Sequence, residues 1–236
     1  MKTTILVAST HKYSYIWESF FGLLEKFWPD YPQVLFMSDG DPHFLAKKYK
    51  RVRIFNLDKD LGFLESYEYM LDFVDTPTVI LLQEDFLIER PVNVKLIEDL
   101  IETMRENRDI GYIRCTPCPG PKGNAIQYPR VMLGQFDLRQ DYLFSFQSTI
   151  WRRTFLEELL HGYEYRSDIL HIEFDLTRAL QQSQKKMKLL GIIRTDFSPQ
   201  GVFDSPIPYR PTAIIKGQLQ PWAFQLIQKH GLPLKF

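Results

Sequence analysis

Two adjacent carboxylates, Glu84 and Asp85, follow the apolar run Thr78–Leu82. The run has the length and composition of a buried strand, so the acids stand at its carboxyl end. An α/β protein holds its ligands at that end of its strands, and paired carboxylates can bind a divalent cation beside a phosphorylated ligand. The alternative is a solvated turn, which we disfavour because residues 86–88 are again apolar and would draw the acids inward.

Strand-length apolar runs alternate with helical patterns through the first half of the chain. Strands are expected at 3–9, 34–37, 52–57, 78–82 and 110–114, and helices at 15–28, 63–74 and 94–105. This alternation predicts an α/β fold with a mainly parallel sheet flanked by helices. Because the carboxyl ends of parallel strands share one edge, Thr10, His11 and Asp39 are expected near the acid pair.

The second half of the chain is less regular. Residues 115–145 are rich in Pro and Gly, and a loop of this length is usually functional or mobile. A strand is expected at 142–146, helices at 154–160, 172–187 and 222–229, and extended segments in the Pro-rich tail. We expect a single domain, with a nucleotide-binding half (about 1–114) and an acceptor half (about 115–236).

Composition narrows the class of protein. Lys plus Arg (29) equals Asp plus Glu (29), so charge does not indicate nucleic-acid binding. No stretch is long and apolar enough to span a bilayer, and the N-terminus is typical of a strand and not of a signal peptide. Cys115 and Cys118 have no second pair with which to bind zinc, and no expected helix N-terminus to activate a thiol. We therefore expect reduced cysteines in a cytoplasmic protein without a transmembrane segment.

Several short segments of the sequence have the order and spacing that one protein family shows. They are residues 10–21 with Trp28-Pro29, the motif 83–86 after its strand, residues 146–151, the acidic pair Glu173 and Asp175, and the closing segments 213–217 and 229–232. Together they resemble bacterial and viral glycosyltransferases of the GT-A type over nearly the whole chain. The resemblance implies a GT-A-like fold, a nucleotide-sugar donor, Mn²⁺ or Mg²⁺, and sugar transfer to a hydroxyl of a glycan or other acceptor.

The family resemblance assigns roles around the donor. Asp85 is expected to bind the cation directly, and Glu84 to contact the ribose or a metal-bound water. The first loop, with Thr10 and His11, is expected to meet the nucleobase. For His11 the alternative, a surface or helix-capping residue, is slightly favoured over contact with the base. Asp39 can accept hydrogen bonds from base or ribose, or serve as a turn residue beside Gly40.

Further roles concern the diphosphate and the acceptor. Arg153 and Lys216 are candidates to hold the diphosphate, since arginine in particular suits phosphate geometry. An acceptor hydroxyl needs a base, and a carboxylate in reach is worth roughly 10²–10⁴-fold in rate. Glu173 is our first choice and Asp175 the second, because residues two apart on a helix point about 200° apart and only one should face the cleft. We expect direct displacement with inversion. The alternative for Glu173 and Asp175 is that both have no chemical role and only stabilise the N-terminus of a helix electrostatically.

Two other functions stay open. The metal motif is Glu-Asp where the family has Asp-X-Asp, residues 171–172 lack the family's Trp, and residues 162–170 form a long polar segment before the acidic pair. A non-catalytic module that binds a nucleotide or glycan is therefore the second hypothesis. A nucleotidyltransferase also uses strand-end acids and a metal, but the first loop, residues 9–13, has no glycine to wrap a triphosphate, so this hypothesis ranks last.

Overall fold

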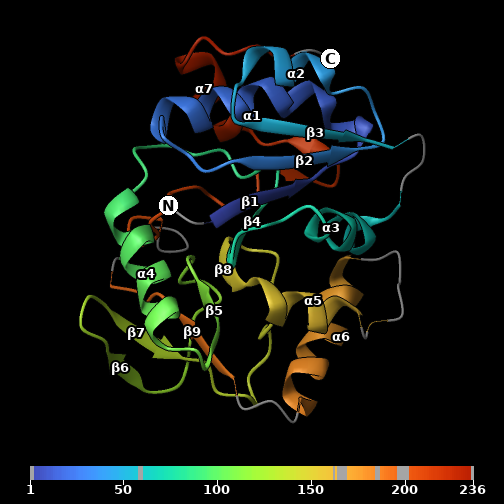
Figure 1. Cartoon of the computed structure of the whole chain (residues 1–236). Coiled ribbons are helices and arrows are strands. Elements are labelled where there is room, and N and C mark those ends of the chain that lie inside the picture. Colours follow the sequence, from blue (N-terminus) through green and yellow to red (C-terminus); the bar gives the residue numbers. More distant parts are fainter. Residues whose placement is uncertain are drawn as a thin grey trace.

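The computed structural model describes residues 3–57, 61–161, 163, 169–183, 187–195 and 202–234. A nine-stranded sheet runs through its centre in the order β3-β2-β1-β4-β8-β5-β9-β7-β6 (Figure 1). The strands are β1 (Thr3–Ala8), β2 (Val34–Ser38), β3 (Val52–Asn56), β4 (Thr78–Leu82), β5 (Ile110–Arg114), β6 (Ala125–Gln127), β7 (Met132–Gln135), β8 (Thr149–Arg152) and β9 (Lys188–Gly191). Strands from both sides of residue 114 thus share one sheet.

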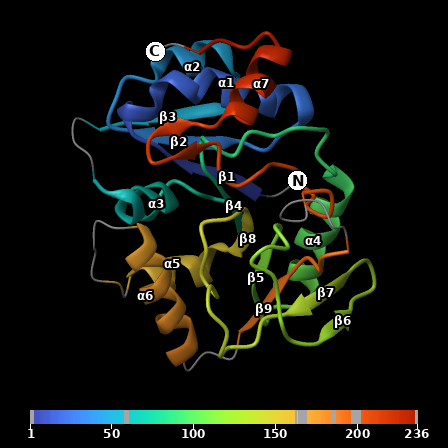
Figure 2. The same cartoon turned by 180° about the vertical axis from the view of Figure 1, so that it is seen from behind.

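Helices cover both faces of the sheet, as Figures 1 and 2 show from opposite sides. The first face carries α1 (Ser14–Phe27), α2 (His43–Lys48), α4 (Val94–Glu106) and α7 (Pro221–Lys229), and the second carries α3 (Phe63–Leu71), α5 (Arg153–His161) and α6 (Ile169–Gln182). The alternation of side chains along β1 explains both layers. Ile5 and Val7 pack into the core of the first face, whereas Leu6 and Ala8 pack into the core of the second.

Strand direction decides which segments meet at the functional edge. Strands β1, β2, β3 and β4 are parallel, so their carboxyl ends share one edge. Strand β8 lies antiparallel between β4 and β5, with Thr149 opposite Leu81. The segment that enters β8, residues 146–148, therefore reaches the same edge as the carboxyl end of β4. The mainly parallel α/β sheet was predicted correctly, but this antiparallel insertion was not.

The prediction of a strand at 142–146 is wrong, because side chains satisfy the backbone of that segment in place of a ladder. The buried guanidinium of Arg114 donates to the carbonyl oxygens of Tyr142 (2.8 Å) and Leu143 (2.7 Å). The N–H groups of Phe144 and Phe146 donate to Thr177 Oγ1 (3.1 Å) and Glu173 Oε1 (2.8 Å). The segment consequently runs along α6 with fixed geometry.

Other boundaries also differ from the sequence expectation. Helix α6 starts at Ile169 and ends at Gln182, so Glu173 lies in its second turn and not at its start. Helix α6 therefore ends five residues before the expected end of the helix 172–187, and the strand β9, which was not expected, begins at Lys188. The segment 115–145, expected to be irregular, contains the antiparallel pair β6 and β7. The short helix α2 was not expected.

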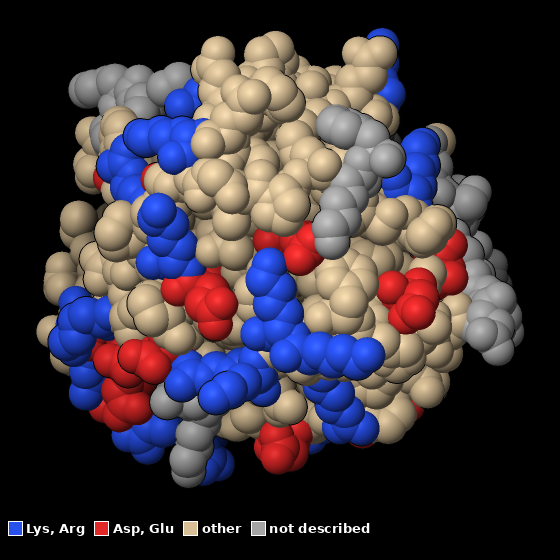
Figure 3. Space-filling view, turned by 90° about the horizontal axis from the view of Figure 1, so that it is seen from above, with Lys and Arg blue, Asp and Glu red and all other residues tan. Residues whose placement is uncertain are grey.

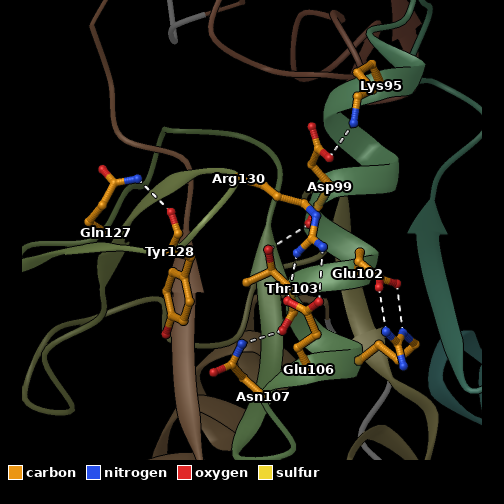
Figure 4. A network of polar contacts seen from close by, with 10 residues as sticks. Lys95, Asp99, Glu102, Thr103, Glu106, Asn107, Gln127, Tyr128 and Arg130 are labelled. Carbon is orange, nitrogen blue, oxygen red and sulfur yellow. Dashed lines mark hydrogen bonds and ion pairs between the residues drawn. The ribbon is translucent and has the colours of Figure 1, made fainter.

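Ion pairs attach the β6–β7 hairpin to α4 (Figure 4). Arg130, between the two strands, donates from both terminal nitrogens to Glu106 at 2.7 and 3.0 Å. Within α4, Lys95 pairs with Asp99 and Arg105 with Glu102. Solvent screens exposed pairs of this kind, so they fix the hairpin's place more than they set overall stability.

The surface carries mixed charge. Figure 3 shows Lys and Arg side chains interspersed with Asp and Glu on the face seen from above. Lys48 pairs with Glu18 at 3.0 Å and Arg51 with Asp30 at 3.2 Å.

Both cysteines, Cys115 and Cys118, are free thiols. In the described part of the chain, no helix has the length and apolar character needed to cross a membrane.

Candidate active site

A cleft of about 940 Å³ opens at the carboxyl edge of the sheet. Its walls come from the first loop after β1, the start of α3, the end of β4, the segment before β8, α6 and the tail. Of the residues predicted from sequence, it brings together Thr10, Glu84, Asp85, Glu173 and Lys216. Segments before and after residue 114 therefore contribute to one site.

The acid pair forms the buried floor of this cleft. Glu84 is 7% exposed and Asp85 is 8% exposed. Burial raises the pKa of Glu84, and the neighbouring Asp85 charge raises it further, while a hydrogen bond from Ser9 opposes both effects. Burial also raises the pKa of Asp85, opposed by the backbone N–H of Ile214. Two carboxyl groups held this close in a dry place tend to keep protons unless a cation replaces them.

The residues present fit a divalent cation. Asp85 Oδ1 is buried and has no hydrogen-bond partner among the described residues, so it is a hard oxygen ligand held ready at an energetic cost. No group of three or more His, Cys, Asp or Glu that could hold a metal occurs in the described ranges. The protein alone therefore supplies few ligands, and phosphate oxygens of a bound ligand would have to supply others.

Asp39 and His11 are hydrogen-bonded to each other beside the cleft. Asp39 Oδ1 accepts the N–H of His11 at 2.5 Å, so Asp39 fixes the first loop. Gly40 lies directly beneath the imidazole, because a Cβ at that position would come within 2.4 Å of His11 Nδ1. Thr10 lines the cleft itself, whereas His11 and Asp39 are exposed beside it. The first loop is thereby held in one position over the end of β1.

A two-stranded hairpin in the tail covers the other side of the cleft. Strands β10 (Ile214–Ile215) and β11 (Gln218–Leu219) are joined by Lys216 and Gly217, both with positive φ (52° and 76°). Two such residues are the pattern of a type I′ turn, in which glycine is favoured. Lys216 and Gly217 both line the cleft, so the turn presents a cation to it. The N–H of Ala213, which donates to the Asp85 carbonyl at 3.1 Å, anchors the hairpin.

The two acids of α6 diverge, as helical geometry requires. Glu173 lines the cleft, and its Oε1 accepts the N–H of Phe146. Asp175 does not line the cleft and accepts the hydroxyl of Tyr163 at 3.0 Å. Of the two acids, the structure therefore places only Glu173 at the cleft.

Arg153 and the acid pair lie at opposite ends of strand β4. Its N–H donates to the carbonyl of Pro77, and its guanidinium donates to the Val74 carbonyl (3.2 Å) and to Glu157 (3.0 Å). Pro77 immediately precedes β4, whereas the acids follow β4. Arg153 therefore cannot hold a diphosphate in this cleft, and its assignment as a ligand-binding residue is corrected.

Sequence reasoning assigned no role to several polar side chains of the cleft, among them Lys12 and Gln147. Lys12 lies near the hairpin turn, since a Cβ on Gly217 would be 3.8 Å from its Nζ. The sequence could have indicated Lys12, because it directly follows Thr10 and His11 in the loop that was expected at the cleft. Gln147 reaches the cleft only because β8 is antiparallel, which the local pattern does not reveal.

Replacing Lys216 with asparagine is expected to weaken the binding of a nucleoside diphosphate about threefold to tenfold, because an exposed cation that lines the cleft is lost. Asparagine tolerates positive φ, so the turn should be retained. Arg153→Ala is the matched control, since it removes a cation at the far edge and should leave the affinity unchanged. Calorimetry with UDP and GDP compares the two, and equal losses would contradict the assignment.

The fold itself is shared with known transferases. A cytidylyltransferase from Leptospira borgpetersenii serovar Hardjo-bovis aligns with a TM-score of 0.54 at 11% identity, over 98% of this chain and 95% of that one. S. aureus TarS aligns with a TM-score of 0.54 at 15% identity, over 83% of this chain and 36% of its own. The mannosyltransferase PcManGT of Pyrobaculum calidifontis, solved with GDP-Man and Mn²⁺, aligns with a TM-score of 0.52 at 13% identity, over 83% of this chain and 55% of its own.

These alignments establish the fold, and the chain spans about a third to a half of the length of TarS and PcManGT. No protein-family model matches the sequence, and no curated protein matches it. The GT-A-like, Rossmann-like fold predicted from the sequence is confirmed, and it is a fold that both glycosyltransferases and cytidylyltransferases use.

Proposed function

We propose that this protein is a glycosyltransferase that moves a sugar from a nucleotide-sugar donor to a hydroxyl of a glycan or other acceptor. The observation that carries the proposal is the placement of two kinds of carboxylate around one cleft. Glu84 and Asp85 form its buried floor, and Glu173 faces it from α6. Sugar transfer needs both a stabilised leaving diphosphate and a base for the acceptor.

The residues divide the chemistry between them. Asp85, with Glu84 beside it, would hold Mn²⁺ or Mg²⁺, and such an ion neutralises charge on a leaving diphosphate. Thr10, in the first loop that Asp39 holds through the N–H of His11, bounds the place for the nucleoside, while Lys12 and Lys216 supply cations beside the phosphates. Glu173 accepts the acceptor's proton, with one oxygen fixed by the Phe146 N–H and the other left to act. We propose direct displacement with inversion at the anomeric carbon.

A second candidate is nucleotidyl transfer, which the alignment over 95% of the cytidylyltransferase chain favours. Two features of the cleft argue against it. The first loop, residues 9–13, has no glycine with which to wrap a triphosphate. A sugar phosphate is also already ionised at neutral pH, so nucleotidyl transfer would give Glu173 no proton to accept. A non-catalytic nucleotide- or glycan-binding module is the third candidate, and only turnover distinguishes it from the first.

A donor screen tests the proposal. The protein with Mn²⁺ is incubated with UDP-, GDP-, dTDP- and CMP-sugars, and separately with CTP or UTP plus sugar phosphates. The expected result is release of nucleoside diphosphate, or of CMP from a CMP-sugar, through transfer or slow donor hydrolysis. Pyrophosphate release from the triphosphates would instead support nucleotidyl transfer. Nucleotide binding without turnover of any donor would support a binding module.

A further inference from the structure

A chain of buried hydroxyl groups behind the cleft ends on Gln147. The Tyr209 hydroxyl donates to Gln147 Oε1 at 2.9 Å, accepts the N–H of Ser148 at 2.8 Å, and lies 3.0 Å from Thr116 Oγ1. Thr116 Oγ1 also lies 3.1 Å from Ser148 Oγ. Of the four residues, only Gln147 lines the cleft. The mechanism proposed above uses none of them.

The directions of these hydrogen bonds follow from proton counting. A tyrosine hydroxyl has one proton, and here it goes to Gln147, so Thr116 must donate to Tyr209 and Ser148 Oγ must donate to Thr116. Burial raises the pKa of Tyr209 to about 12, so this proton stays in place at neutral pH. With its oxygen occupied by Tyr209, the Gln147 amide keeps its two N–H donors for another partner, and Gln147 lines the cleft.

Two further contacts connect the surroundings of Gln147 to Asp85 on one side and to Glu173 on the other. The Tyr209 ring stacks on Phe86, with centroids 4.3 Å apart and planes 13° apart, and Phe86 directly follows Asp85. On the other side, Phe146, the chain neighbour of Gln147, donates its N–H to Glu173. Gln147 is thus connected through packed, buried groups to both halves of the proposed chemistry.

We propose that Gln147 determines sugar specificity by donating a hydrogen bond to a hydroxyl of the transferred sugar, with Tyr209 as its positioning residue. The inference rests on the proposed function. Transfer requires the anomeric carbon to lie between the leaving diphosphate at Asp85 and the acceptor at Glu173, which is the space that Gln147 faces. The nucleoside lies elsewhere, against the first loop, so Gln147 should act on the sugar and not on the nucleotide.

Calorimetry in the presence of Mn²⁺ separates these contributions. The ligands are UDP and GDP, compared with UDP-glucose, UDP-N-acetylglucosamine and GDP-mannose. Gln147→Ala is expected to raise the Kd of the sugar nucleotide that wild type binds best about threefold to tenfold, while the Kd of the matching diphosphate changes less than about twofold. Tyr209→Phe keeps the ring stack and should shift the Kd in the same direction by less. Tyr128→Phe, which removes a buried hydroxyl with no partner in the described chain, is the control.

The double variant shows whether Tyr209 acts through Gln147. Gln147→Ala combined with Tyr209→Phe should bind no worse than Gln147→Ala alone, because the anchor has nothing left to hold. Losses that multiply would show that Tyr209 is merely structural. If Gln147→Ala loses affinity for the diphosphate and the sugar nucleotide equally, or loses no affinity, the inference is overturned. Neither result affects wild-type turnover, so the proposed function would stand. A wild type that binds no sugar nucleotide would overturn the inference and the proposed function together.

Discussion

Asp85→Asn is expected to lower kcat/KM for sugar transfer by roughly 10²–10³-fold, because the buried oxygen that would bind the cation loses its charge. The substitution keeps the size and the hydrogen-bonding outline of the side chain, so the floor of the cleft should keep its shape. The measurement is transfer, or donor hydrolysis, with the sugar nucleotide identified in the screen, at saturating Mn²⁺. Rates equal to wild type would remove Asp85 from the mechanism.

The pH dependence of the unfolding free energy of the metal-free protein shows whether Asp85→Asn is folded. The direction of this dependence follows from the two buried carboxyl groups. The pKa values of Glu84 and Asp85 are raised above their ordinary values of 4.5 and 3.8, so the folded state holds protons that the unfolded state has released. Unfolding free energy therefore falls as pH rises from about 4 through neutral. Asp85→Asn should flatten this fall and be at least as stable as wild type at pH 8, as thermal melts with chelator can show.

Glu173→Gln is expected to reduce transfer by roughly 10²–10⁴-fold while donor affinity is retained, because only the proton acceptor is removed. Glutamine keeps an oxygen that can accept the Phe146 N–H, so the segment entering β8 should stay in place. Transfer rates measured alongside calorimetric donor binding distinguish loss of chemistry from loss of the fold.

Asp175→Asn is the matched control for Glu173, two residues away on the same helix. Its carboxylate accepts the Tyr163 hydroxyl outside the cleft, so transfer should stay close to the wild-type rate. A large loss in Asp175→Asn combined with normal transfer in Glu173→Gln would reverse the roles that the structure suggests for these two acids.

The sequence predicts the floor of the site because that part depends on local pattern. An apolar strand ending in Glu84-Asp85, repeated strand and helix periods, and a first loop after β1 are each readable within a few residues, and parallel strands bring their ends together. The divergence of Glu173 and Asp175 also follows from helix geometry alone. Such features require no knowledge of distant contacts.

The rest of the site depends on contacts between distant segments. Gln147 faces the cleft because β8 is antiparallel and because Arg114, Thr177 and Glu173 hold the preceding segment. Its anchor, Tyr209, is 62 residues away in the chain. Arg153 illustrates the converse, since its residue type suits phosphate but strand direction carries it to the opposite edge. The place of β8 in the sheet and its antiparallel direction cannot be read from a local pattern.

Titration of Mn²⁺ followed by electron paramagnetic resonance, with and without UDP, GDP, dTDP and CDP, tests the central assignment most directly. The wild type is predicted to bind Mn²⁺ weakly alone and markedly more tightly with one of these diphosphates, because phosphate oxygens complete the ligands that Glu84 and Asp85 begin. Asp85→Asn should lose that increase. An increase of the same size in Asp85→Asn, or none in wild type with any diphosphate, would contradict the account.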